Sequence, residues 1–169
     1  MILEARAANC FSSKFVLKVN GRPFGKFQGR WFGESLDVDL TERRHLQFRK
    51  VGWLGSQFEL VDPTYKQLLG GCSRSGLFTS SWDLNLSAGP GRLEKAGWFG
   101  SAYEFKQGAQ VLARVDRLGW CGRGWLVDSK DALTQEDLLL IGLVYQIIQQ
   151  RKAAQQRSAH HHAAGSGMV

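Results

Sequence analysis

Eleven residues near the C-terminus, Leu138–Ile148 (LLLIGLVYQII), place the strongest constraint on how this chain of 169 residues folds. Only Gly142 and Gln146 interrupt its apolar side chains, so a helix built from this stretch is apolar on every side. A helix that rests on a sheet needs one apolar stripe, whereas this helix must be surrounded. Its length of about 16 Å is too short for a bilayer, which requires about 20 apolar residues. We therefore expect it inside the protein.

The residues around this stretch carry the signals of a helix start and a helix end. Thr134 and Asp137 form a capping-box pattern at the start, with Asp where Glu or Gln is usual. Arg151 and Lys152 follow the apolar run, where the helix dipole favours positive charge. These signals predict a helix over residues 134–152. The residues that remain, 153–169, are rich in Ala, Gly and His, and are predicted to form a flexible tail.

Most of the chain before the helix alternates apolar and polar residues, a period that is typical of half-buried antiparallel strands. Such runs occur in both halves of the sequence, as in Phe15, Leu17 and Val19, in Leu36, Val38 and Leu40, in Trp82, Leu84 and Leu86, and in Val111, Ala113 and Val115. Phrases of glycine and tryptophan separate the runs, and glycine supplies the positive φ that turns require. The chain is therefore predicted to be mainly β with one α-helix, its antiparallel sheet closing around that helix.

The sequence also contains an internal repeat. KVGWLGSQFEL (50–60) resembles KAGWFGSAYEF (95–105), and Trp31 and Trp53 are followed 67 residues later by Trp98 and Trp120. Laying residues 10–55 on residues 77–122 without gaps gives ten identities in 46 positions. Unrelated sequences would give roughly three. The repeat predicts an internal duplication with halves at about 10–76 and 77–152. Leu126–Asp128 repeats Leu60–Asp62 if one residue is removed between the copies.

A closed sheet around one apolar helix, the phrase GWLGSQFELVD (52–62) and the late helix EDLLLIGLVYQII (136–148) together resemble the tubby C-terminal-like superfamily. This superfamily includes LURP-one-related proteins and phospholipid scramblases, and the resemblance covers roughly residues 10–152. It implies a single domain over residues 1–152, a barrel of about twelve strands threaded by the helix, and recognition of phosphoinositides. The basic pocket of tubby has no residue-by-residue match here. The chain also lacks the proline-rich region, cysteine cluster and acidic calcium segment of scramblases.

Composition limits the class of partner and the compartment. The formal net charge is +7 and the isoelectric point is about 9.6, which suits anionic partners or simply favours solubility. Cys10, Cys72 and Cys121 are too few and too scattered for a disulfide framework or a metal site. With no apolar leader at the N-terminus, we expect a cytoplasmic protein, with peripheral contact to a membrane as one possibility.

The candidate binding residues are cations on alternating strand positions together with two tryptophans at glycine-rich turns. They are Arg43, Arg49, Lys50, Trp53, Arg117, Trp120 and Arg123. Arg49, Lys50, Arg117 and Arg123 are expected to form one basic ridge beside Trp53 and Trp120. Tryptophan tolerates the boundary between water and lipid, and each nearby cation adds about 1 kcal/mol on anionic membranes. A solvated barrel rim is the alternative interpretation.

We find no catalytic constellation and expect neither metal nor cofactor. His45 stands apart from any His or Cys companion and is interpreted as a surface residue, and His160–His162 as a feature of composition. The leading hypothesis is a non-enzymatic binding or scaffold module for anionic lipid headgroups or an acidic protein. The alternatives are nucleic-acid binding, scramblase-like lipid handling, and a lipocalin-like barrel with an interior ligand. The oligomeric state is left open.

Overall fold

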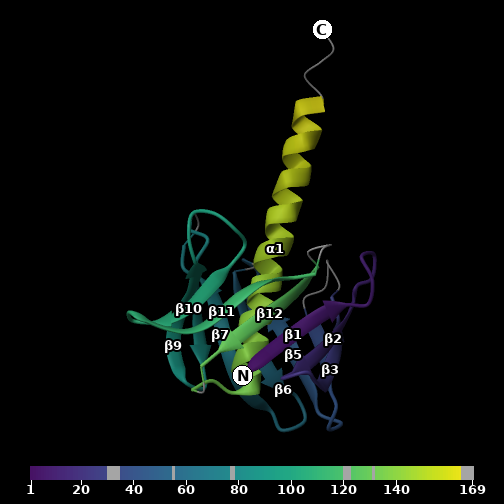
Figure 1. Cartoon of the computed structure of the whole chain (residues 1–169), viewed down its shortest axis with the longest axis vertical. Coiled ribbons are helices and arrows are strands. Elements are labelled where there is room, and N and C mark those ends of the chain that lie inside the picture. Colours follow the sequence, from purple (N-terminus) through teal and green to yellow (C-terminus); the bar gives the residue numbers. More distant parts are fainter. Residues whose placement is uncertain (30–34, 55, 77–78, 120–122, 131, 165–169) are drawn as a thin grey trace.

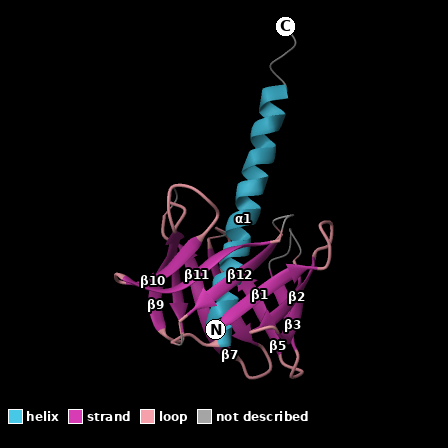
Figure 2. Cartoon of the chain, in the orientation of Figure 1, coloured by secondary structure: helices cyan, strands magenta, loops and turns pink. Residues whose placement is uncertain are grey.

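A computed structural model describes residues 1–29, 35–54, 56–76, 79–119, 123–130 and 132–164. Within these residues, twelve strands form a closed antiparallel barrel around a single helix (Figures 1 and 2). The elements are β1 (Ile2–Ala7), β2 (Lys14–Val19), β3 (Arg22–Gln28), β4 (Ser35–Leu40), β5 (His45–Lys50), β6 (Gln57–Asp62), β7 (Gln67–Arg74), β8 (Trp82–Leu86), β9 (Gly89–Lys95), β10 (Tyr103–Gln107), β11 (Gln110–Leu118), β12 (Gly124–Ser129) and α1 (Gln135–Ala164). The predicted fold class is confirmed.

Every strand pairs with its neighbours in sequence, and β1 closes the ring by pairing with both β2 and β12. In the closing pair, Leu3 stands opposite Val127 and Ala5 opposite Trp125. Closure leaves no strand of the barrel with an unpaired edge, so the backbone groups that an open sheet would expose are hydrogen-bonded. The N-terminal strand is therefore part of the barrel wall.

The core is the contact between the inward side chains of the strands and the first half of α1. Strand residues such as Leu17, Leu46 and Leu60 are fully buried, and so are Leu139 and Ile141 on the helix. Burying one such side chain contributes about 1.5–3 kcal/mol. Because strands surround α1, all its sides need apolar residues, which explains the uninterrupted apolar run.

The helix continues beyond the barrel. It was predicted to end at residue 152, but it extends to Ala164, so residues 153–164 are helical and the predicted boundary is corrected. Figure 1 shows this second part projecting along the barrel axis, away from the strands. Residues 154–161 are exposed, in contrast to the buried residues from Leu138 to Tyr145.

The strand bounds agree with the 67-residue offset. Residues 22–28 and 89–95 form β3 and β9, and residues 57–62 and 124–129 form β6 and β12. The proposed removal of one residue before Leu126 is wrong, because Leu60 and Asp62 face inward as Val127 and Ser129 do. In the second half, residues at the offset of β7 belong to α1, and β1 fills the corresponding place in the ring. The duplication itself stays a prediction.

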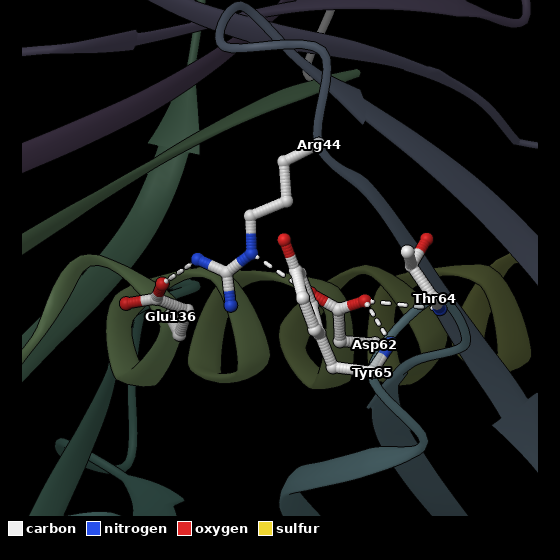
Figure 3. A network of polar contacts seen from close by, with 5 residues as sticks. All are labelled: Arg44, Asp62, Thr64, Tyr65 and Glu136. Carbon is white, nitrogen blue, oxygen red and sulfur yellow. Dashed lines mark hydrogen bonds and ion pairs between the residues drawn. The ribbon is translucent and has the colours of Figure 1, made fainter.

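We call the end where α1 begins the base and the other end the exit end. At the base, Arg44 donates from Nε to Asp62 Oδ2 over 3.0 Å and from Nη1 to Glu136 on α1 (Figure 3). Asp62 is 1% exposed and also accepts hydrogen bonds from the backbone N–H groups of Thr64 and Tyr65. Burial alone would raise the pKa of Asp62, but the hydrogen bonds from Arg44 and the two N–H groups outweigh it and lower the pKa. This network ties the helix start to two strands.

The capping box is also present at the base. The backbone N–H of Thr134 donates to Asp137 Oδ2 and the N–H of Asp137 donates to Thr134 Oγ1, each over 3.2 Å. The Asp137 carboxylate reaches further, to the N–H and hydroxyl of Ser87 at the end of β8. The predicted helix start is therefore confirmed, and the same carboxylate anchors α1 to the sheet.

Candidate functional site

The exit end combines exposed apolar side chains with cations. Five large apolar residues lie in connections between strands at this end: Phe11 (96% exposed), Trp53 (86%), Leu54 (74%), Trp98 (94%) and Phe99 (96%). They belong to the connections β1–β2, β5–β6 and β9–β10, which Figure 1 shows on the side from which α1 projects. The sequence placed the tryptophans at the barrel rim, which is right for Trp53 and Trp98. Both side chains face solvent.

The predicted basic ridge does not form as one surface. Arg49 and Lys50 end β5, whereas Arg117 lies near the end of β11 and Arg123 just before β12. In the ring of strands, β5 and β11 stand on opposite sides, so the two groups share the exit end but are separated by α1.

The other predicted site residues are placed as follows. Trp53 lies near Lys50, in the connection that follows β5. Arg43 lies in the turn between β4 and β5, at the base, with a positive φ of 56°. Trp120 lies outside the described residues. Arg49 forms an ion pair on the outer surface with Glu59, over 3.3 Å.

Arg117 and Arg123 are brought together beside the helix. Arg117 Nη2 donates to Gln149 Oε1 on α1 over 3.0 Å, and Arg123 Nη1 donates to the backbone oxygen of Cys10 over 2.6 Å. Both side chains line a cavity of about 480 Å³ between α1 and the barrel rim. Trp125 forms part of the floor and is held by a hydrogen bond from its Nε1 to Gln146 Oε1, over 2.9 Å.

Two further cations at the exit end were missed by sequence reasoning. Arg151 lies over the ring of Trp82 at 5.2 Å, and Lys152 lies over the ring of Tyr103 at 5.0 Å. Burial lowers the pKa of Arg151, and the positive charge of Arg74 lowers it further. The signal that could have found them is the position of both cations immediately after the apolar run, where the helix leaves the lumen through a rim of aromatic side chains.

His45 lies on the outer surface, as predicted. Its Nδ1 contacts Asp39 at 2.9 Å and its Nε2 contacts Asp37 at 3.2 Å. The hydrogen bond with Asp39 is the main reason that the pKa of His45 is raised, although partial burial opposes it. Among the residues that the structure describes, no cluster of three or more His, Cys, Asp or Glu side chains is arranged to hold a metal ion. In the same residues, no helix combines the length and the apolar character needed to cross a membrane.

A comparison of the chain with models of known families, with curated proteins and with solved structures finds no match. The case for a function therefore rests on the exit end itself: large apolar side chains exposed on three connections, and cations on both the barrel rim and the helix.

Proposed function

We propose that this protein is a non-enzymatic binding module that attaches to anionic membrane surfaces through its exit end. The observation that carries the proposal is the exposure of Phe11, Trp53, Leu54, Trp98 and Phe99 at that end. Exposed apolar groups gathered in one region commonly mark an interaction site. Indole and phenyl rings partition into the boundary between lipid headgroups and hydrocarbon.

The charges at the exit end favour an anionic surface. Lys50 and Arg117 come from the strands, Arg123 lies just before β12, and Arg151 and Lys152 come from the helix. Each cation close to an anionic leaflet contributes about 1 kcal/mol, and the contribution falls within a Debye length. The apolar side chains and the cations would thus bind the same membrane. The apolar side chains would enter the bilayer interface, and the cations would attract the anionic headgroups.

The projecting helix has to be accommodated in this arrangement. The part of α1 from Ala153 to Ala164 is polar and would reach about 18 Å beyond the barrel, so it cannot enter the hydrocarbon of a membrane. Isolated helices shorter than about 12–15 residues are marginally stable in water. Because residues 158–161 are exposed, the last turns of α1 can bend aside or unwind at low cost and lie along the headgroups.

A nucleic-acid partner fits the exit end less well. Trp53 and Trp98 lie in connections separated by four strands of the ring, so they are not adjacent stacking positions for successive bases. Leu54 cannot stack on a base. The lipocalin-like alternative is wrong, because α1 occupies the interior that a ligand would need.

Vesicle flotation tests the proposal. We expect the protein to float with vesicles of phosphatidylcholine and phosphatidylserine, to float less as salt is raised, and to stay behind with phosphatidylcholine alone. Replacing both Trp53 and Trp98 with Ser should weaken binding about tenfold or more, because two large rings lose their contact with the interface. Binding should also shift the fluorescence of these tryptophans to shorter wavelength.

The matched control replaces two exposed apolar residues at the base, Tyr65→Ser with Leu68→Ser, which are 75% and 60% exposed. This control should bind as the unmodified protein does. Equal binding by the tryptophan variant and the unmodified protein would contradict the proposal. So would retention of single-stranded DNA under conditions in which anionic vesicles do not bind.

A further inference from the structure

The cavity beside α1 has an unusual balance of charge. Among the described residues that line its volume of about 480 Å³ are Arg117, Arg123 and Arg157, and they include no Asp or Glu. Three arginines from three different segments therefore line one space. Like charges repel, so their convergence is unfavourable unless an anion joins them.

Among the described residues, neither Arg117 nor Arg123 forms an ion pair with a carboxylate. Their acceptors are neutral oxygens, those of the Gln149 amide and the Cys10 backbone. Several arginines on the outer surface of the barrel pair with carboxylates instead, as Arg92 does with Asp83 at 3.0 Å and Arg49 with Glu59 at 3.3 Å. Each guanidinium carries five N–H donors, so most donors of the cavity arginines remain for a ligand.

The carboxylate next to Arg117 in sequence, that of Asp116, does not line the cavity. It accepts a hydrogen bond from Ser101 Oγ and another from the backbone N–H of Arg117. Both hydrogen bonds end on Oδ1 and hold this carboxylate outside the set of residues that line the cavity.

A second observation concerns the amide of Gln149. Gln149 lines the cavity, and its Nε2 is buried with no hydrogen-bond partner, while its Oε1 is held by Arg117. A buried donor without a partner is unfavourable. Arg117 fixes the orientation of the amide, because the opposite rotamer would bring N–H groups against the guanidinium. The orientation of this amide therefore serves to hold Arg117 at the cavity.

We propose that this cavity binds a phosphate group, as a monoester or a diphosphate, through Arg117, Arg123 and Arg157, with Gln149 holding Arg117 in position. Guanidinium groups match the oxygen geometry of phosphate and form charge-assisted hydrogen bonds with it. Phe11 and Trp125 give the cavity an apolar wall, against which the substituent of a phosphate monoester can lie. The phosphate can belong to a soluble molecule or to a lipid headgroup, and the site does not depend on the membrane proposal.

Titration calorimetry with inorganic pyrophosphate tests the soluble arm, using the full chain. We expect saturable binding with one site per chain. Arg117→Gln and Gln149→Glu should each weaken it about tenfold or more, the second because a carboxylate would pair with Arg117 and repel the ligand. The control Arg114→Gln lies on the same strand, where its side chain faces outward near Glu104 at 3.7 Å, and it should change affinity less than twofold.

The lipid arm compares vesicles that contain phosphatidic acid, a phosphate monoester, with vesicles of equal charge that contain phosphatidylglycerol. A headgroup ligand is indicated if the protein prefers phosphatidic acid and Gln149→Glu removes that preference. Pyrophosphate binding without any vesicle binding supports the cavity while contradicting the membrane proposal. The inference is overturned if neither pyrophosphate nor phosphatidic acid binds, or if Arg114→Gln weakens binding as much as Arg117→Gln does.

Discussion

Gly142 shows how closely α1 fits the barrel. A Cβ atom at this position would lie 2.1 Å from the ring of Trp125, far inside van der Waals contact. The glycine interrupts the apolar run of the helix because the largest side chain of β12 occupies the space that another residue would fill. Its role is to leave room, and no turn or special backbone angle is involved.

Replacing Gly142 with Ala sets two effects against each other. Helix propensity favours Ala over Gly by about 1 kcal/mol. Overpacking against a rigid ring costs typically 1–3 kcal/mol, and here the clash exceeds an ordinary one. We expect the free energy of unfolding to fall by about 1–2 kcal/mol, measured by denaturant titration. Gly97→Ala is the control, since nothing lies within 4 Å of the added methyl group. A more stable Gly142→Ala variant would show that Trp125 moves freely.

Asp62, at the base of the barrel, should make the free energy of unfolding depend on pH. Its pKa is lowered in the folded protein, so it stabilises the fold at every pH above its ordinary pKa of about 4. The stabilisation is lost as pH falls through the lowered folded pKa. Asp62→Asn removes the charge that faces Arg44 and should lower the free energy of unfolding by about 1–3 kcal/mol at neutral pH.

The measurement is the difference in unfolding free energy between the unmodified protein and Asp62→Asn over a pH series. It should be constant from neutral pH to about pH 5 and should shrink below that. Asp83→Asn is the control, because Asp83 pairs with Arg92 on the outer surface with both side chains about half exposed, and its loss should cost less than about 1 kcal/mol. A pH-independent difference for Asp62→Asn would exclude the ion pair as its cause.

Among the elements, α1 has two parts with different roles. Leu140 is 1% exposed inside the barrel, whereas Ala154 lies on the exposed part. Leu140→Asp would bury a charge without a partner, so we expect loss of the cooperative unfolding transition, or its displacement to much lower temperature. Ala154→Asp, with the same new residue on the same helix, should shift unfolding by less than about 0.5 kcal/mol. Comparable melting curves for the two variants would mean that α1 does not lie inside the barrel in solution.

Strand β1 is the element that the repeat did not foresee. The halves were placed at residues 10–76 and 77–152, which leaves β1 outside both, yet β1 is paired on both sides and carries the fully buried Leu3 and Ala5. The residues that lie 67 positions after β7 belong to α1 and form no strand. Without another strand in that place, the barrel would stay open. β1 closes that gap, so the first seven residues are as structural as any other strand.

In the whole molecule, the two ends of the barrel differ. The base is closed by polar contacts between the helix start and the sheet, those of Arg44 and Asp137. The exit end carries the exposed aromatic side chains, the cations of rim and helix, and the cavity between them. One end therefore stabilises the fold and the other is available to a partner, which is the arrangement expected of a barrel whose interior is occupied.

Much of the fold could be predicted from local patterns. The period-two runs gave the strands, and the uniformly apolar run gave a surrounded helix. The helix boundary at residue 152 was wrong, because residues 153–164 lack an apolar stripe, so their helicity follows from continuation of the buried part. The pairing of Leu126 with Leu60 was wrong because it was based on residue identity alone. The alternation of inward and outward residues in β12 reflects burial, and it supports the ungapped alignment.

The candidate site was harder to predict. Arg49 and Arg117 sit in equivalent parts of two sequence copies, which suggested one ridge, but a ring places equivalent strands on opposite sides. Arg157 was assigned to a flexible tail, yet it lines the cavity with Arg117 and Arg123.

The order of amino acids was enough to establish the strand period, the buried helix and the capping of its start, because each depends on neighbours along the chain. Closure by β1, the exposure of Trp53 and Trp98, and the meeting of three arginines at one cavity depend on contacts between residues up to more than a hundred positions apart. Such contacts are set by how a closed sheet curves around its helix, and no local pattern records that curvature.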